Sequence, residues 1–184
     1  MSRMLILLSL ALVWSSYLPA QQLTLGEFRR FEHACVPEAD DRELLALART
    51  ESHLHPWALS VNRPAALARR LGYRSGRVYL KHQPQSKTEA IRWTRELEAA
   101  GLTVSVGILQ VNRERSPYSV EQLLDPCRNL QEGWSIFLSA YRHEVRKGAG
   151  GQRALLAAFA AYNAGSPLAG FRNGYVWSIL KNYY

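Results

Sequence analysis

Cysteine is scarce in this sequence, which contains only Cys35 and Cys127. Neither cysteine lies in a CxxC or CxxH spacing, so the support for a zinc site is weak, and neither has neighbours typical of a catalytic thiol. A disulfide is the preferred interpretation, because the N-terminal residues described below favour export from the reducing cytoplasm. The sequence therefore predicts a Cys35–Cys127 disulfide.

Acidic residues are absent from residues 52–88, and the whole chain has a net charge of +8 with a pI near 9.8. A basic surface suits nucleic acid, an anionic membrane or an anionic polymer such as a bacterial cell wall, and a solvated basic face has the same composition. No nucleic-acid-binding motif accompanies the charge, so we expect no nucleic-acid partner. The basic residues of this stretch are Arg63, Arg69, Arg70, Arg74, Arg77, Lys81 and Lys87.

The first 20 residues differ from the rest of the chain. Arg3 is followed by the apolar run "MLILLSLALVW", which is short for a bilayer span, and by "SSYLPA", which ends at the small residue Ala20. This pattern predicts a secretory signal peptide at residues 1–20 and one domain at residues 21–184, with no stable membrane span after cleavage. An uncleaved anchor is the alternative, since Leu18 is bulky for a cleavage site.

Capping residues and apolar spacing predict that most of the domain is helical. Asp40 and Glu43 form a capping-box pattern for a helix that reaches Glu51 or Ser52, and Pro56 prevents its continuation. Further helices are expected over "AIRWTRELEAA" after the Ser86–Glu89 box, in a short segment after Ser119, through "QRALLAAFAAYNAG" to Gly165, and over "YVWSILKNYY". A long helix is expected from Asp125–Pro126 to Gly148. Its apolar face would comprise Leu130, Trp134, Phe137, Leu138, Tyr141 and Val145.

Two segments lack this helical spacing. Residues 57–85 carry Pro64, Gly72, Gly76 and Pro84, and we expect a loop there with at most a short hairpin around "RVYL". "LTVSVGILQVN" alternates β-branched residues but is short, so its assignment stays open. The expected fold is mainly α (α+β), with short β/loop regions near residues 60–82 and 102–112.

Glu51 stands out because it continues an apolar helical stripe. Leu44, Leu47 and Ala48 precede it by seven, four and three residues, so all four side chains share one face. A carboxyl group aimed at a core loses hydration, which raises its pKa and suits it to donate a proton near neutral pH. The alternative is a carboxylate at the helix end that pairs with Arg49 or with a later arginine.

Four segments in order resemble the motifs of the lytic transglycosylases. "RTESHLHPWALS" resembles their glutamate-serine motif, "SVGILQVN" their glycine and glutamine motif, "AAYNAG" their tyrosine-asparagine motif, and "YVWSIL" their closing helix. The residues between the motifs are most similar to the specialised enzymes of conjugation and type IV secretion systems. This resemblance implies a lysozyme-like fold, Glu51 as catalytic acid, and a glycan cleft bordered by Gly107, Gln110, Asn112, Tyr162 and Asn163.

Other roles for these residues remain open. Val106 stands where many members have serine, and the role of the neighbouring Ser105 is undecided. Tyr162 and Asn163 would also suit a packed tyrosine and a polar helix end, and Asn112 could serve in a turn. Trp57 could stack on sugar or belong to the core.

The resemblance implies an enzyme that cleaves peptidoglycan between MurNAc and GlcNAc and leaves 1,6-anhydroMurNAc ends, and the signal-like start of the chain predicts that it is periplasmic. The first acidic residue after Glu51 is Glu89, so a second catalytic carboxylate is not apparent, whereas most glycosidases use two. A hydrolytic muramidase and a catalytically idle wall-binding assembly factor are the alternatives. We expect no cofactor and no metal, because no third metal ligand accompanies His53 and His55. The expected partners are glycan strands and components of a secretion or conjugation apparatus.

Overall fold

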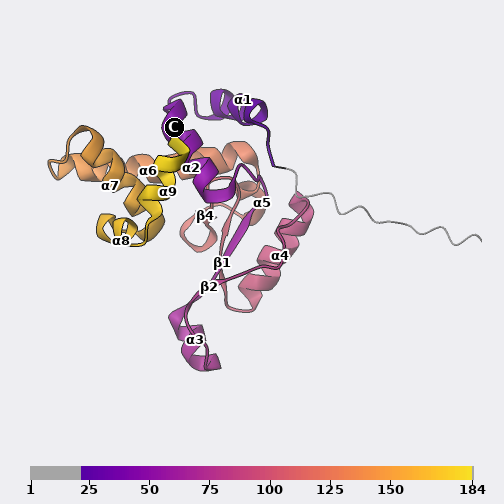
Figure 1. The fold of residues 1–184 in the computed structure, drawn as a ribbon. Helices are drawn as coiled ribbons and strands as arrows, with labels where there is room; N and C mark the ends of the chain where they lie inside the picture. The colour runs from indigo at the N-terminus through magenta and orange to yellow at the C-terminus, as the bar shows by residue number, and fades with distance from the viewer. Residues whose placement is uncertain (1–21, 184) are drawn as a thin grey trace, which may run out of the picture.

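The structure is a computed structural model that describes residues 22–183, so the predicted signal peptide lies outside the described residues. The described chain is mainly helical with one small sheet, which confirms the predicted fold class (Figure 1). Its helices are α1 (Leu25–Cys35), α2 (Asp41–Ser52), α3 (Ala65–Leu71), α4 (Lys87–Ala99), α5 (Val120–Leu123), α6 (Pro126–Arg146), α7 (Gly151–Ala164), α8 (Pro167–Arg172) and α9 (Tyr175–Tyr183), with a 3-10 turn, η1 (Arg113–Arg115). No helix within residues 22–183 has the length and apolar character needed to cross a membrane.

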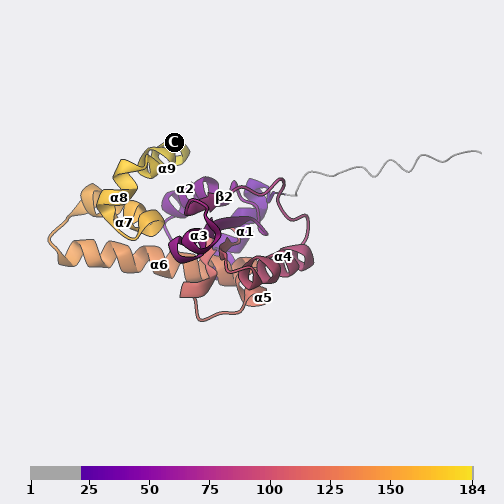
Figure 2. The ribbon, with the colours of Figure 1, turned by 90° about the horizontal axis from the view of Figure 1, so that it is seen from below.

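Helices α1, α2 and α6–α9 form what we call the helical half. Its core is aromatic as well as aliphatic: Phe137 stacks on Trp134 with ring centroids 4.9 Å apart and lies 4.8 Å from the ring of Phe159. Figure 2 shows the long helix α6 extending beneath α7 and α8. The apolar stripe of α2 is fully buried in this core, as its spacing predicts; the stripe is Leu44, Leu47 and Ala48.

Strands β1 (Leu59–Arg63), β2 (Gly76–Val78), β3 (Thr103–Val106) and β4 (Val111–Asn112), with α4 and α5, form the sheet half. The antiparallel strand order is β2-β1-β3-β4. Strand residues such as Leu59, Val104 and Val106 are buried in a second, aliphatic core. Because side chains alternate along a strand, the intervening residues point to the opposite face of the sheet.

The predicted helices after residue 85 agree with the structure, and the antiparallel pair β1–β2 agrees with the short β region expected near residues 60–82. The rest of residues 57–85 is more regular than the expected loop. It contains the unanticipated α3, which projects beyond the ends of β1 and β2 (Figure 1). Pro64 occupies the N-cap of α3, and Gly72 ends it with a left-handed backbone, φ 70°. The proline and glycine therefore delimit a helix in a segment where their presence suggested none. Helices α1 and α8 were also not anticipated.

Helix α6 begins as predicted, with the Asp125 side chain accepting a hydrogen bond from the backbone N–H of Arg128 and Pro126 in the first turn. The predicted apolar face of α6 is wrong at one position, because Val145 is 44% exposed and the neighbouring Glu144 is buried instead. The first turn also contains Cys127, which is bonded to Cys35 at the end of α1, with the two Cα atoms 5.2 Å apart. The predicted disulfide therefore fastens α1 to the long helix.

Candidate active site

Glu51 is the penultimate residue of α2. The helix ends immediately afterwards because His53 and Leu54 take left-handed backbone conformations, with φ of 55° and 64°. These angles turn the chain towards β1, and Glu51 stays on α2 at the C-terminal end of the buried stripe. The carboxyl group therefore lies where the helical half meets the sheet half.

Burial raises the pKa of Glu51 from 4.5 to about 7, although a hydrogen bond from Tyr175 and the positive charge of Arg77 act in the opposite direction. The Tyr175 hydroxyl donates to Glu51 Oε1 over 2.5 Å. Burial and the nearby Glu51 carboxylate raise the pKa of Tyr175 well above its ordinary value, so this hydroxyl keeps its proton. Glu51 is thus balanced between its two protonation states near neutral pH, which suits a general acid that must also act as a base.

The sheet half presents a polar face towards Glu51. Ser60 on β1 pairs with Ser105 on β3, which in turn pairs with Asn112 on β4, so these three side chains form a row across the sheet. Asn62 lies two residues beyond Ser60 on the same face. Ser105, whose role the sequence left undecided, therefore lies on the same face as Asn112.

Gln110 and Gly107 belong to the turn between β3 and β4. The Gln110 side-chain amide donates to the carbonyl oxygens of Ala58 and Gly107 over 3.0 and 2.8 Å, which leaves its own oxygen for another partner. Gly107 is buried at φ 82°, and a Cβ there would lie 2.3 Å from the side-chain nitrogen of Asn129. Gly107 thus provides room for Asn129, while Gln110 reaches the groove described below.

Tyr162 and Asn163 come from the end of α7. The Tyr162 hydroxyl donates to the carbonyl oxygen of Leu109 over 2.6 Å, which ties α7 to the β3–β4 turn. The Asn163 side-chain oxygen accepts a hydrogen bond from Asn173 over 2.8 Å. Asn112 also has a local partner, because its side-chain oxygen accepts hydrogen bonds from the backbone N–H groups of Glu114 and Arg115. Tyr162, Asn163 and Asn112 therefore each make a local structural hydrogen bond, and each also borders the groove.

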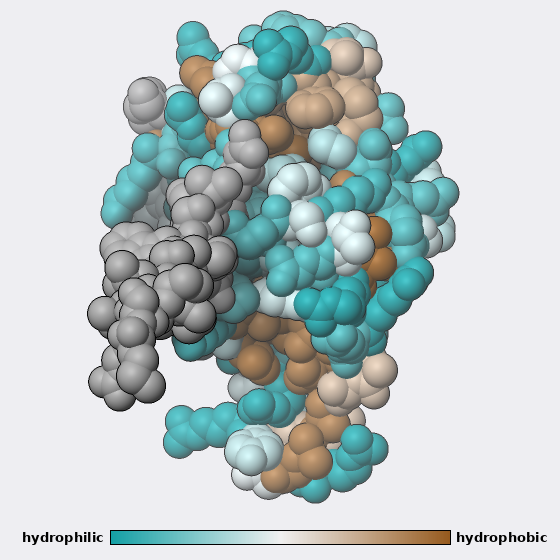
Figure 3. All heavy atoms as spheres, turned by 90° about the vertical axis from the view of Figure 1, so that its right-hand side faces the viewer, coloured by the Kyte–Doolittle hydropathy of each residue, from teal (hydrophilic) through white to brown (hydrophobic). Residues whose placement is uncertain are grey.

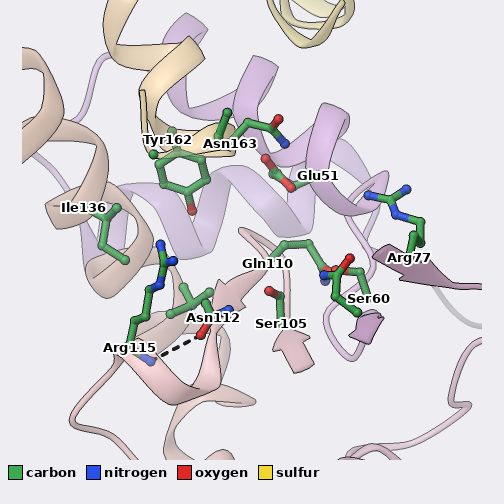
Figure 4. A pocket seen from close by; sticks show the side chains of 14 residues that line it. Glu51, Ser60, Arg77, Ser105, Gln110, Asn112, Arg115, Ile136, Tyr162 and Asn163 are labelled. Carbon is green, nitrogen blue, oxygen red and sulfur yellow. Dashed lines mark hydrogen bonds between the residues drawn. The ribbon is translucent and has the colours of Figure 1, made fainter. Parts of the chain in front are cut away.

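A groove of about 390 Å³ brings these groups together (Figure 4). Glu51 and the α7 residues form one wall, and the polar sheet face forms the other. Of the described residues that line it, Glu51 is the one carboxylate. The lining comprises Glu51, Ser60, Asn62, Arg77, Ser105, Gln110, Val111, Asn112, Arg115, Ile136, Tyr162, Asn163, Ala164 and Gly165.

The remaining candidates lie outside the groove lining. His53 is exposed and borders the adjoining hollows. His55 is buried, and its Nδ1 accepts a hydrogen bond from the backbone N–H of Trp57 over 3.1 Å. Trp57 packs against the sheet-half core. Among residues 22–183, the one cluster of three potential metal ligands is Glu32, His33 and Asp41, where Arg29 already contacts Glu32 and Asp41.

Sequence reasoning missed several residues that line or support the groove. Tyr175 was assigned only to the closing helix, and its contact with Glu51 joins positions 124 residues apart. Ser60 and Asn62 lay in a segment expected to be loop, although their alternation with Leu59 and Val61 is a strand signal. Arg77 appeared only as part of the basic stretch. Nothing in the local sequence of Asn129 indicated that its side chain supports the β3–β4 turn.

Comparison with known proteins adds independent evidence. Residues 30–174 match the family described as "Transglycosylase SLT domain". The "Type IV secretion system protein virB1" of Brucella abortus biovar 1 is 36% identical over 142 residues, which cover 75% of this chain and 54% of that protein. "Protein virB1" of Agrobacterium fabrum is 30% identical over 171 residues, covering 87% of this chain and 60% of that protein.

The chain thus spans about half the length of the Brucella relatives that it matches. No solved structure gives a significant match. The family match covers most of the chain and includes every residue of the groove lining. The chain therefore belongs to the transglycosylase SLT domain family.

Proposed function

We propose that this protein is a peptidoglycan lytic transglycosylase that opens the wall locally for a type IV secretion apparatus. One observation carries the proposal: among the described residues that line the groove there is a single carboxyl group, Glu51, whose pKa is about 7. Most glycosidases place two carboxylates beside the scissile bond, one as acid and one as base or nucleophile. A lone carboxyl group favours a reaction in which the substrate supplies the nucleophile.

In the proposed reaction, protonated Glu51 donates its proton to the oxygen between MurNAc and GlcNAc as that bond breaks. The Glu51 carboxylate then accepts the proton of the MurNAc C6 hydroxyl, whose oxygen attacks C1 and closes the 1,6-anhydro ring. No water is consumed, and Glu51 returns to its starting state. Holding the internal hydroxyl near C1 also avoids the entropy cost of recruiting a separate nucleophile.

Other groups in the site suit this cycle. The Tyr175 hydroxyl hydrogen-bonds the Glu51 carboxyl group and stabilises the carboxylate formed after the first step. Ser60, Ser105 and Asn112 offer hydroxyl and amide groups to the sugar hydroxyls and N-acetyl groups. The signal-like residues 1–20 support a periplasmic location, and the names of the VirB1 relatives support a type IV secretion context.

The products of peptidoglycan digestion test the reaction. We expect muropeptides with 1,6-anhydroMurNAc ends, one water lighter than hydrolysed ends by mass spectrometry. Glu51→Gln removes the transferable proton, so activity should fall at least ~100-fold, the lower range for general acid catalysis. The matched control is Glu38→Gln, which changes an exposed carboxylate outside the groove and should retain activity.

Other outcomes would replace the proposal. Digests that contain only hydrolysed reducing ends would make the protein a muramidase. Binding to peptidoglycan without cleavage by the folded wild-type protein would make it a wall-binding assembly factor. Full activity in Glu51→Gln would remove Glu51 from the mechanism.

A further inference from the structure

Two arginines mark opposite ends of the Glu51 groove. Arg77 on β2 and Arg115 at the end of η1 both line it, and Figure 4 shows their guanidinium groups on either side of Glu51. Arg77 also borders the two hollows that adjoin the groove near Glu51. These two positive charges therefore belong to the groove and not to a remote part of the surface.

Neither guanidinium group is neutralised by a neighbouring carboxylate. Among the described residues, Arg113 pairs with Glu98 over 3.8 Å, whereas neither Arg77 nor Arg115 has a carboxylate oxygen within 4.0 Å. The backbone N–H of Arg115 is fixed by Asn112, but both arginine side chains are exposed. Within residues 22–183, the groove thus offers two charged donors that form no salt bridge with a carboxylate.

The exposed basic residues continue beyond Arg77. The projecting segment that carries α3 contains Arg69, Arg70 and Arg74, and residues 52–88 include no acidic residue. In Figure 3 this segment forms the lower end of the molecule, where hydrophilic and hydrophobic side chains are both exposed. Its positive field would attract an anionic polymer towards the Arg77 end of the groove.

We propose that Arg77 and Arg115 bind carboxylates of the peptides attached to the glycan, so that the groove selects anionic, peptide-bearing strands over uncharged ones. The inference rests on the proposed function and specifies its substrate class. A guanidinium group binds a carboxylate through two parallel N–H donors. In peptidoglycan the muramic acid residues carry peptides with free carboxyl groups, and residues on both sides of the cleaved bond could present them to the two ends of the groove.

Arg77 could instead influence only Glu51, because its charge favours the Glu51 carboxylate. The two roles differ in their dependence on the ligand. A direct effect on Glu51 would alter catalysis for every glycan by a similar factor. Carboxylate binding alters the preference between charged and uncharged glycans, even when Glu51 has been replaced by a neutral residue.

Binding in the Glu51→Gln background separates these roles and does not depend on cleavage. The probes are soluble glycan strands with native peptides and the same strands after conversion of their carboxyl groups to amides with carbodiimide and ammonia. We expect the charged strands to bind about fivefold or more tightly. Arg77→Gln and Arg115→Gln should each reduce this preference about two- to fivefold, the range for solvent-exposed ion pairs, and added salt should reduce it further.

Arg146→Gln is the matched control, since it makes the same charge change at an exposed position at the end of α6, outside both the groove and the α3 segment. It should retain most of the preference, and Arg77→Lys should retain part of it. Equal binding of the two strands, or a loss that is the same for both strands in Arg77→Gln and Arg115→Gln, would overturn the inference. Product analysis of the wild-type protein tests the proposed reaction separately, so the two failures can be distinguished.

Discussion

The helical half and the sheet half contribute different chemistry to the same groove. The helical half buries Glu51 and supplies Tyr175, which together determine the protonation of the acid. The sheet half supplies a face of hydroxyl and amide groups on short strands, without a carboxylate in the groove. One half therefore sets the reactivity of the acid, and the other provides the polar surface suited to a sugar chain.

The two halves also differ in how they are held together. The helical half has aromatic stacking around Phe137 and a disulfide between α1 and α6. The sheet half has a small aliphatic core and is joined to α6 by hydrogen bonds of the Asn129 side chain. Stability and catalysis should therefore respond separately to changes in the two halves.

Loss of the disulfide should give the largest effect on stability. Cys35 and Cys127 are 92 residues apart, and a cross-link over such a loop stabilises the folded state by about 4–5 kcal/mol on the loop-entropy estimate. The double serine variant should therefore melt roughly 10–15 °C lower, as measured by calorimetry. Neither cysteine lines the groove, so activity should persist where the variant is still folded. Two free thiols in oxidised wild-type protein would contradict this assignment.

Asn129→Ala should have the next largest effect, because this side chain joins the two halves. It accepts a hydrogen bond from the N–H of Leu109 and donates to the carbonyl oxygens of Val106 and Leu123, at 2.7, 2.9 and 2.9 Å. Removing three buried hydrogen bonds should lower the free energy of unfolding by about 3 kcal/mol, as measured by urea denaturation.

Gln131→Ala provides the control for Asn129→Ala. Gln131 is exposed on the same helix and donates one side-chain hydrogen bond, to the carbonyl oxygen of Cys35. Its loss should cost less than about 1 kcal/mol. Similar losses in the two variants would mean that Asn129 does not couple the halves.

The helical half was the more predictable from sequence. Apart from α1 and α8, its helices were identified by local signals, such as the Asp40 cap of α2 and the Asp125–Pro126 start of α6. The placement of Glu51 follows from its spacing to buried leucines. The error at Val145 arose because the buried position near the end of α6 falls one residue earlier, at Glu144, which a search for apolar residues passes over.

The sheet half depends on partners that are distant in sequence. Strand β1 pairs with β3, so Ser60 meets Ser105, which lies 45 positions later in the chain, and no local pattern specifies that register. The need for glycine at position 107 also depends on a distant partner, since the Asn129 side chain that fills the space beside it comes from α6. The family resemblance selected residues at the groove, but it did not reveal which of them contact substrate and which support the backbone.

We expect the smallest of these effects for Tyr175→Phe. This variant separates the reactivity of the acid from sugar binding most directly. The variant removes the hydroxyl that hydrogen-bonds Glu51 and leaves the ring in place. Losing one hydrogen bond to a developing charge should reduce kcat about tenfold, with little change in KM.

The pH profile gives Tyr175→Phe a signature that a packing defect would not produce. The Tyr175 hydrogen bond lowers the pKa of Glu51, so its removal should raise that pKa above about 7. Since protonated Glu51 starts the reaction, the fall in kcat at high pH should move to higher pH. Tyr183→Phe makes the same change on the same helix but acts on Glu43, and it should leave the profile unmoved. A Tyr175→Phe profile identical to that of the wild type would show that burial alone sets the protonation of Glu51.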